Sequence, residues 1–187
     1  PPTGVAAAII AAREFAQGIA AGPANEIART TVLVERRVLP ADHDILHPAG
    51  INIFLQESSG VRLAAARTLS LDPHWRQLSV RRLMLMLRRA LARQMQWCVF
   101  EPNSPALRRE LVQVIDSFLR SLYRLGAFRG ATEAEAFFVR ADDRLNARHR
   151  IDNGQLIVEV GVAPAEPLEF IVVQIVRDGD GTLTLED

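Results

Sequence analysis

Residues 79–126 read SVRRLMLMLRRALARQMQWCVFEPNSPALRRELVQVIDSFLRSLYRLG, and this stretch decides the fold class. Apolar residues recur at spacings of three and four in both halves, which predicts two amphipathic helices joined at Glu101-Pro102-Asn103. Ser79 is the expected N-cap of the first helix, and Ser104 followed by Pro105 opens the second. The expected apolar faces are Val80, Leu83, Met84, Leu87, Leu91 and Met95, then Leu107, Leu111, Val114, Ile115, Phe118, Leu122 and Leu125.

The sequence on both sides of this helix pair is typical of strands. It is rich in β-branched residues and is punctuated by Gly and Pro. Glu57-Ser58-Ser59-Gly60 is a plausible hairpin turn. The predicted elements are a helix over 4–17, strands over 30–39, 51–56 and 61–69, a helical turn over 41–46, strands over 137–141, 155–162 and 168–177, and a weak strand in the tail. This order predicts an α+β fold, in which a mixed β-sheet is packed by the two long helices and an extended terminal arm follows.

The charges are unevenly distributed along a chain of zero net charge. Residues 76–129 hold eleven Arg and three acidic residues, whereas residues 130–187 hold five Arg and twelve acidic residues. All 22 basic residues are Arg, which suits bidentate pairing with carboxylates, although a GC-rich genome gives the same bias. The Arg-rich helices could instead track phosphates, but they lack interleaved aromatic residues and the acidic segment opposes a polyanion. We therefore expect no nucleic-acid partner.

No pattern in the sequence indicates a catalytic or metal site. His43 and His47 have the spacing of zinc ligands, but Asp44 stands where a catalytic Glu is needed and Pro48 ends any helix there. Asp178 and Asp180 resemble a calcium loop only faintly, and a surface turn is the better interpretation. The single cysteine, Cys98, sits between apolar neighbours as a core residue would. We expect no cofactor, no metal, no enzymatic activity and no membrane partner.

Several blocks of the sequence resemble the C-terminal region of contractile tail-sheath proteins, which occur in phage tails, R-type pyocins and extracellular contractile injection systems. The resemblance covers the chain from about residue 45 onward. The blocks are HPAGINIF (47–54), ARTLSLDPHWRQLSVRRL (66–83), QWCVFEPN (96–103), AFFVRAD (136–142) and GQLIVEVGVAPAEPLEFIVVQI (154–175).

The resemblance implies a mechanical function in place of chemistry. A sheath subunit polymerises with copies of itself in stacked hexameric rings around an inner tube, with baseplate and terminator proteins at the ends. Contraction of the sheath drives the tube through a target envelope. The implied organisation is a segment over 1–44 that leads in from upstream domains, a core domain over 45–167, and a C-terminal arm strand and tail over 168–187. The particle is implied to assemble in the bacterial cytoplasm, as part of a phage tail or of a released tail-like particle.

Two sets of residues follow from that resemblance as candidate contacts. A sheath must hold its tube through weak contacts, and exposed charges meet that demand. The candidate tube contact is Arg109, Arg120 and Arg124 on the second helix, with Arg88, Arg89 and Arg93 on the first helix as the alternative. The candidate inter-subunit arm is Phe170, Ile171, Val172, Val173, Gln174 and Ile175, because Pro164 and Pro167 interrupt the ladder before it and both of its faces are largely apolar.

Two other functions compete with the sheath subunit. A baseplate or terminator component built on a sheath-like domain would share the same sequence blocks. An Arg-rich nucleic-acid-binding module would share only the basic helices, and salt-dependent retention on DNA would identify it.

Overall fold

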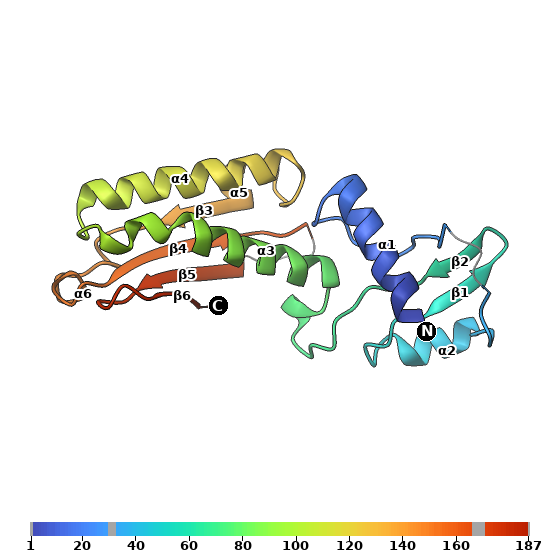
Figure 1. Cartoon of the computed structure of the whole chain (residues 1–187). Coiled ribbons are helices and arrows are strands. Elements are labelled where there is room, and N and C mark those ends of the chain that lie inside the picture. The colour runs from blue at the N-terminus through green and yellow to red at the C-terminus, as the bar shows by residue number, and fades with distance from the viewer. Residues whose placement is uncertain (1, 30–32, 166–170, 187) are drawn as a thin grey trace. The chain divides into compact units, whose positions relative to one another are not determined.

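A computed structural model of the chain describes residues 2–29, 33–165 and 171–186. These residues form two compact units, 1–83 and 84–187, and the division between them falls inside helix α3 (Leu78–Gln94). The domain boundaries predicted from the sequence lie elsewhere, after residues 44 and 167. Figure 1 labels the helices and strands of both units.

The first unit is built around a small antiparallel sheet. Strand β1 (Phe54–Glu57) pairs with β2 (Gly60–Leu63), and Glu57 opposite Gly60 confirms the predicted hairpin turn. Residues 25–28 run along the other edge of β2, where the Asn25 and Ala28 amides donate to Leu63 and Val61, each at 2.8 Å. The remaining elements of this unit are α1 (Pro2–Gln17), α2 (Pro40–Leu46) and the 3-10 turn η1 (Pro73–Trp75).

The strand predicted over 30–39 is wrong over the residues that can be judged. Residues 30–32 lie outside the described part of the chain, and 33–39 contain no strand. The chain bends at Glu35 and Arg36, and Pro40 then begins α2. β-branched residues favour a strand only where a neighbouring strand receives them, so composition alone overstated this element.

The second unit is a four-stranded sheet covered by helices. The strand order is β3 (Phe137–Arg140), β4 (Leu156–Val162), β5 (Ile171–Arg177) and β6 (Leu183–Glu186). The α+β class is confirmed, but both sheets are antiparallel and not mixed. For β1–β2, β4–β5 and β5–β6 the short connections explain this, because a parallel pair needs a long crossover. The other elements are η2 (Gln96–Phe100), α4 (Pro105–Arg124), α5 (Glu133–Ala136) and α6 (Arg148–Asp152).

The two long helices supply a large share of the apolar core. Figure 1 shows α4 beside α3, in front of one face of the four-stranded sheet. All six residues of the apolar face predicted for α3 are buried, with exposures of 1 or 2%. The helix begins at Leu78, so Ser79 lies inside its first turn and is not the predicted cap. At α4 the prediction holds: the Ser104 hydroxyl accepts from the Leu107 amide at 3.1 Å, with Pro105 next.

The apolar face of α4 differs from the predicted one at three positions. Val114 and Leu125 are exposed, whereas Leu119, which the prediction omitted, is fully buried. The buried residues recur every four positions as Leu107, Leu111, Ile115 and Leu119. In a helix of 3.6 residues per turn, residues four apart are slightly offset, so this stripe winds around α4. By the middle of the helix Val114 no longer lies on it. No helix among the described residues is both long enough and apolar enough to cross a membrane.

Candidate interaction surfaces

The predicted tube-contact residues of α4 differ in how free their charges are. Arg109 is exposed, and its Nε donates to the Pro105 carbonyl of the same helix at 3.2 Å. Arg120 is held by two carboxylates, Asp116 at 2.8 Å and Glu133 of α5 at 2.9 Å. Arg124 is exposed and has no hydrogen bond or ion pair within the described part of the chain. Only Arg109 and Arg124 therefore present an uncompensated charge to a partner.

The alternative stripe on α3 divides in the same way. The Arg88 guanidinium is half-buried and donates to the Leu185 carbonyl of β6 at 2.6 Å, which ties the helix to the last strand. Arg89 and Arg93 are exposed, and neither contacts an acidic residue in the ranges that the structure describes. Arg89 and Arg93 are four positions apart, so they lie on one side of the helix.

The predicted inter-subunit arm lies in β5, which within this chain has β4 on one side and β6 on the other. β5 pairs with β4 along one edge, from Ile171 opposite Val162 to Arg177 opposite Leu156. Along its other edge it pairs with β6. The edge toward β4 is thus paired along the whole strand and the edge toward β6 from Gln174 to Arg177, and Phe170 lies outside the described residues.

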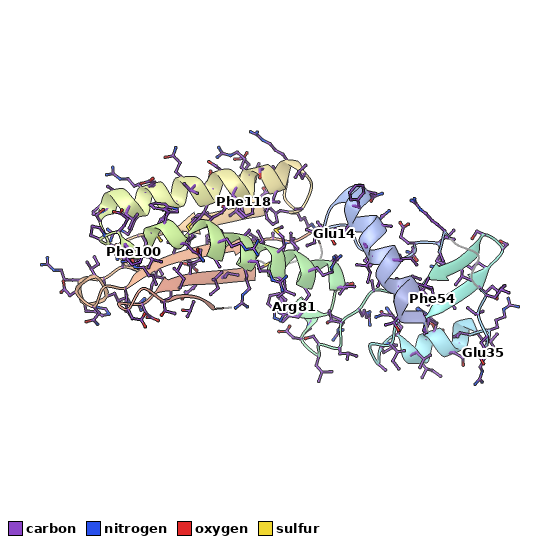
Figure 2. The ribbon with its side chains drawn as sticks, in the orientation of Figure 1. Glu14, Glu35, Phe54, Arg81, Phe100 and Phe118 are labelled. Carbon is purple, nitrogen blue, oxygen red and sulfur yellow. The ribbon has the colours of Figure 1, made fainter. Side chains whose placement is uncertain are left out.

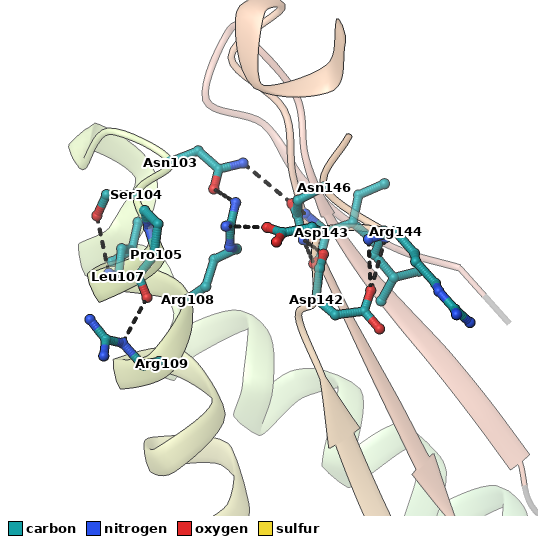
Figure 3. A network of polar contacts seen from close by, with 12 residues as sticks. Asn103, Ser104, Pro105, Leu107, Arg108, Arg109, Asp142, Asp143, Arg144 and Asn146 are labelled. Carbon is teal, nitrogen blue, oxygen red and sulfur yellow. Dashed lines mark hydrogen bonds and ion pairs between the residues drawn. The ribbon is translucent and has the colours of Figure 1, made fainter. Parts of the chain in front are cut away.

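A polar network fixes the start of α4 against the loop after β3. Figure 3 shows the Arg108 side chain reaching Asn103 and Asp143. Its guanidinium donates to Asn103 Oδ1 at 3.2 Å and to Asp143 at 2.7 Å. The Arg108 side chain is only 8% exposed, whereas that of Asp143 is 90% exposed, so one end of the ion pair lies in water. The buried Asn146 side chain receives the Ile157 amide at 2.9 Å and donates to the Ile157 carbonyl at 2.8 Å. It thereby replaces a neighbouring strand where β3 has ended.

Arg177 is a second buried charge, and its partners are main-chain carbonyls. It is 4% exposed and donates to Cys98 at 2.6 Å, to Glu101 at 2.7 Å and to Gly154 at 3.2 Å. These carbonyls belong to the link between α3 and α4 and to the turn before β4. Arg177 therefore joins three segments that lie far apart in the sequence.

The described residues hold no cluster of three or more side chains that could bind a metal ion. The His43 and His47 rings stack at 4.9 Å, and the Arg67 charge and desolvation hold the pKa of His47 below its ordinary value, with desolvation the larger cause. Burial raises the pKa of the Cys98 thiol, although Arg177 opposes this shift, so Cys98 is a poor nucleophile. Asp178 and Asp180 lie in the turn before β6, where the Asp178 amide donates to the Thr182 carbonyl at 2.9 Å.

Sequence reasoning missed the three buried polar residues. The signal for Arg177 was present, because it continues the inward-facing alternation of Val173 and Ile175. Arg108 lies on the apolar stripe of α4, three residues before Leu111, which could have marked it as buried. Nothing in the loop sequence distinguishes Asn146 from an ordinary turn asparagine.

Comparison with known proteins gives a family match. The family model described as the phage tail sheath C-terminal domain matches residues 70–177. No curated protein matches the chain.

Three solved structures of contractile particles contain similar chains. A chain of the PVC sheath complex in the contracted state, from an extracellular contractile injection system, is 30% identical with a TM-score of 0.84 over 95% of this chain and 51% of its own. A chain of the anti-feeding prophage helical sheath in the contracted state is 32% identical, with a TM-score of 0.83 over 91% of this chain and 49% of its own. A chain of the six-fold symmetrised baseplate of that prophage is 32% identical, with a TM-score of 0.83 over 91% of this chain and 48% of its own. The chain thus spans about half the length of the chains it matches.

Proposed function

This chain belongs to the phage tail sheath family, and from that we propose that it forms the C-terminal half of a structural subunit that polymerises around an inner tube. Contraction of the polymer would drive the tube through a target envelope. The observation that carries the proposal is the match over 95% of the chain, at 30% identity, to a chain of a contracted sheath complex. That similarity extends over both compact units.

The proposed partners are other copies of the subunit in stacked hexameric rings, the inner tube, and baseplate and terminator proteins. We place assembly in the bacterial cytoplasm, and the subunit then remains part of a phage tail or of a released particle. The proposed role is mechanical and not enzymatic. In support of this, the buried polar residues serve the fold. Asn146 and Arg177 bind main-chain carbonyls, and Arg108 binds the side chains of Asn103 and Asp143.

For the tube contact, we propose Arg109 and Arg124 of α4. Contacts with the tube must break on contraction, and exposed ion pairs are worth only about 0–1 kcal/mol each, so they suit a reversible attachment. Arg120 contributes less, because Asp116 and Glu133 already compensate its charge.

For strand exchange between subunits, we propose β6 in place of β5. In the described chain β6 pairs with no strand other than β5, and apart from the Leu185 carbonyl, which receives Arg88, its outer edge is open to a strand from a neighbour. An open edge strand is a ready template for a strand from another chain.

The test is electron microscopy of native particles made with and without the gene for the subunit. We expect sheathed particles with the gene, bare tubes without it, and repeating density for this domain along the whole sheath. Density restricted to one ring would refute the sheath role. It would favour a baseplate or terminator component, a candidate supported by the similar chain in the anti-feeding prophage baseplate.

A further inference from the structure

The sheet of the second unit has one covered face and one partly open face. In β5, Val173 and Ile175 point toward the helices and are 3% and 4% exposed. Val172, Gln174 and Val176 alternate with them on the opposite face and are only half-buried, although β5 is flanked by strands on both sides. Figure 1 shows α4 and its neighbour α3 over one face, with α6 at the end of the sheet. On this second face Ile157 of β4 is 5% exposed and the Phe138 ring lies against Gly161, so the room for another layer lies over β5 and around Glu159.

The open face carries an uncompensated carboxylate among apolar side chains. Glu159 of β4 stands opposite Gln174 of β5, between residues such as Val172 and Val176. Glu159 is half-buried, and no hydrogen bond or ion pair joins its side chain to another residue in the described ranges. Arg140 lies opposite it on β3, but its guanidinium stacks on the Phe138 ring at 4.5 Å. A partly desolvated carboxylate favours a cationic partner.

The outer side of α3 and η2 has the complementary composition. Leu85, Arg89, Arg93 and Trp97 follow one another every four residues, and Phe100 comes next. Leu85 and Trp97 are 40% and 42% exposed, and Phe100 is 95% exposed. Figure 2 labels Phe100 beyond the end of α3. Exposed Trp, Phe and Arg together are typical of the centre of a protein interface.

We propose that the stripe Leu85, Arg89, Arg93, Trp97 and Phe100 of one copy packs on the open sheet face of a second copy, with Arg89 or Arg93 paired to Glu159. The choice of a second copy rests on the proposed sheath function. A helix with an apolar stripe is the usual cover for an open sheet face. The two surfaces lie on opposite sides of the same helix-and-sheet unit, so the contact is head-to-tail and repeats into a ring or an open polymer.

Charge exchange tests the pairing in the complete subunit expressed with its inner tube. Arg89→Glu, Arg93→Glu and Glu159→Arg are compared for polymer recovered by sedimentation, with Arg129→Glu, at another exposed arginine, as the control. We expect Glu159→Arg and at least one Arg reversal to lower recovery about tenfold or more. Combining that reversal with Glu159→Arg should restore recovery to within about threefold of the parent. Normal recovery of both Arg variants, or the absence of any rescue, overturns the contact.

A crosslinking measurement separates this inference from the sheath proposal. Cys98 is buried, so thiols introduced by Arg93→Cys and Glu159→Cys are the reactive pair, and they lie on opposite sides of one unit. Oxidation of the double variant should give a ladder of dimers, trimers and larger species, whereas neither single variant should form that ladder. If the parent sheathes tubes but no ladder forms, this contact falls and the sheath function stands. If a ladder forms from a chain that never sheathes tubes, the contact stands and the sheath function falls.

Discussion

At the residue scale, Arg177 shows how a buried charge can hold a fold together without an acidic partner. Three carbonyls from two different connections receive its guanidinium within 3.2 Å. Buried carbonyls that lose such a donor cannot bond to water in its place. Removing the donor therefore costs more free energy than the hydrogen bonds contribute to stability.

We predict that Arg177→Met lowers the free energy of unfolding by about 2–4 kcal/mol, because it strands buried carbonyls that now receive a charged donor. Denaturant unfolding of the chain measures this. The matched control is Arg148→Met, since the Arg148 side chain is 93% exposed and pairs only distantly with Asp152. A loss below about 0.5 kcal/mol at Arg177, the range of ordinary surface substitutions, would show that the carbonyls find other partners.

His47 gives a second residue-scale prediction, on pH. Its folded-state pKa lies below the ordinary value of 6.5, so the unfolded chain binds the proton first as the pH falls. The contribution of His47 to stability is complete above about pH 6.5. It is lost as the pH falls from that value to the lowered pKa of the folded state. Unfolding at pH 7 and pH 5 should show a smaller loss in His47→Gln than in the parent. His149→Gln, at an exposed histidine, should leave the loss unchanged, and equal losses in all three proteins would contradict the assignment.

At the element scale, local sequence rules located the long helices well and the short strands less well. The Ser104-Pro105 start of α4 and the six-residue face of α3 could be predicted, because capping and period 3.6 act within one helix. Burial of Leu119 was also within reach of that period, because Leu119 follows Ile115 by four positions, whereas the exposure of Leu125, just past the end of α4, depends on tertiary packing. The segment 33–39 shows the same limit, since a strand exists only with a partner.

We predict that Ser104→Ala destabilises the chain by about 1 kcal/mol, because it removes the hydroxyl that accepts the Leu107 amide at the start of α4. Thermal unfolding reports the change. Ser117→Ala in the exposed middle of the same helix is the control, and it should be neutral or slightly stabilising, since Ala is the better helix former. Equal effects at both positions would mean that water satisfies the first turn as well as Ser104 does.

The tube contact belongs to the same scale, because it concerns one face of α4. Arg109→Glu combined with Arg124→Glu should leave bare tubes beside empty sheath polymer, since the reversed charges repel acidic groups that we expect on the tube. Arg120→Glu is a poorer probe, because it also breaks the ion pairs with Asp116 and Glu133. Electron micrographs give the fraction of tubes that carry sheath, with Arg148→Glu as the control. Normal sheathing by the double variant would exclude this face of α4.

At the scale of the whole molecule, the α+β class and the order of elements could be predicted, but the strand topology could not. Apolar faces on both sides of 171–177 predict a strand that is covered by a neighbouring subunit. Within this chain the strand has α3 and α4 over one face and a partly open surface on the other. Apolar content on two faces indicates only that both are covered somewhere. It does not say whether the cover comes from the same chain.

Two deletions distinguish the core strand from the exchangeable one. Removal of residues 168–187 takes away β5, whose Val173, Ile175 and Arg177 are buried, and exposes the apolar edge of β4. We expect that variant to lose cooperative unfolding. Removal of residues 183–187 takes away only β6, whose Leu183 and Leu185 are half-buried, and the bond from Arg88 to Leu185. That variant should fold with a lower midpoint and fail to polymerise, because the strand proposed for exchange is gone.

Circular dichroism with thermal unfolding and sedimentation of polymer measure both deletions. Replacing Leu183 and Leu185 with Ser in the complete chain is the companion variant, since it weakens β6 without shortening the main chain. It should reduce polymer in the same direction as the 183–187 deletion. Full polymerisation after loss of 183–187 would remove β6 from the assembly, and a folded 168–187 deletion would show that β5 is dispensable to its own sheet. Because β5 carries hydrogen bonds on both edges and β6 on one, a strand can be exchanged at lower cost at β6 than at β5.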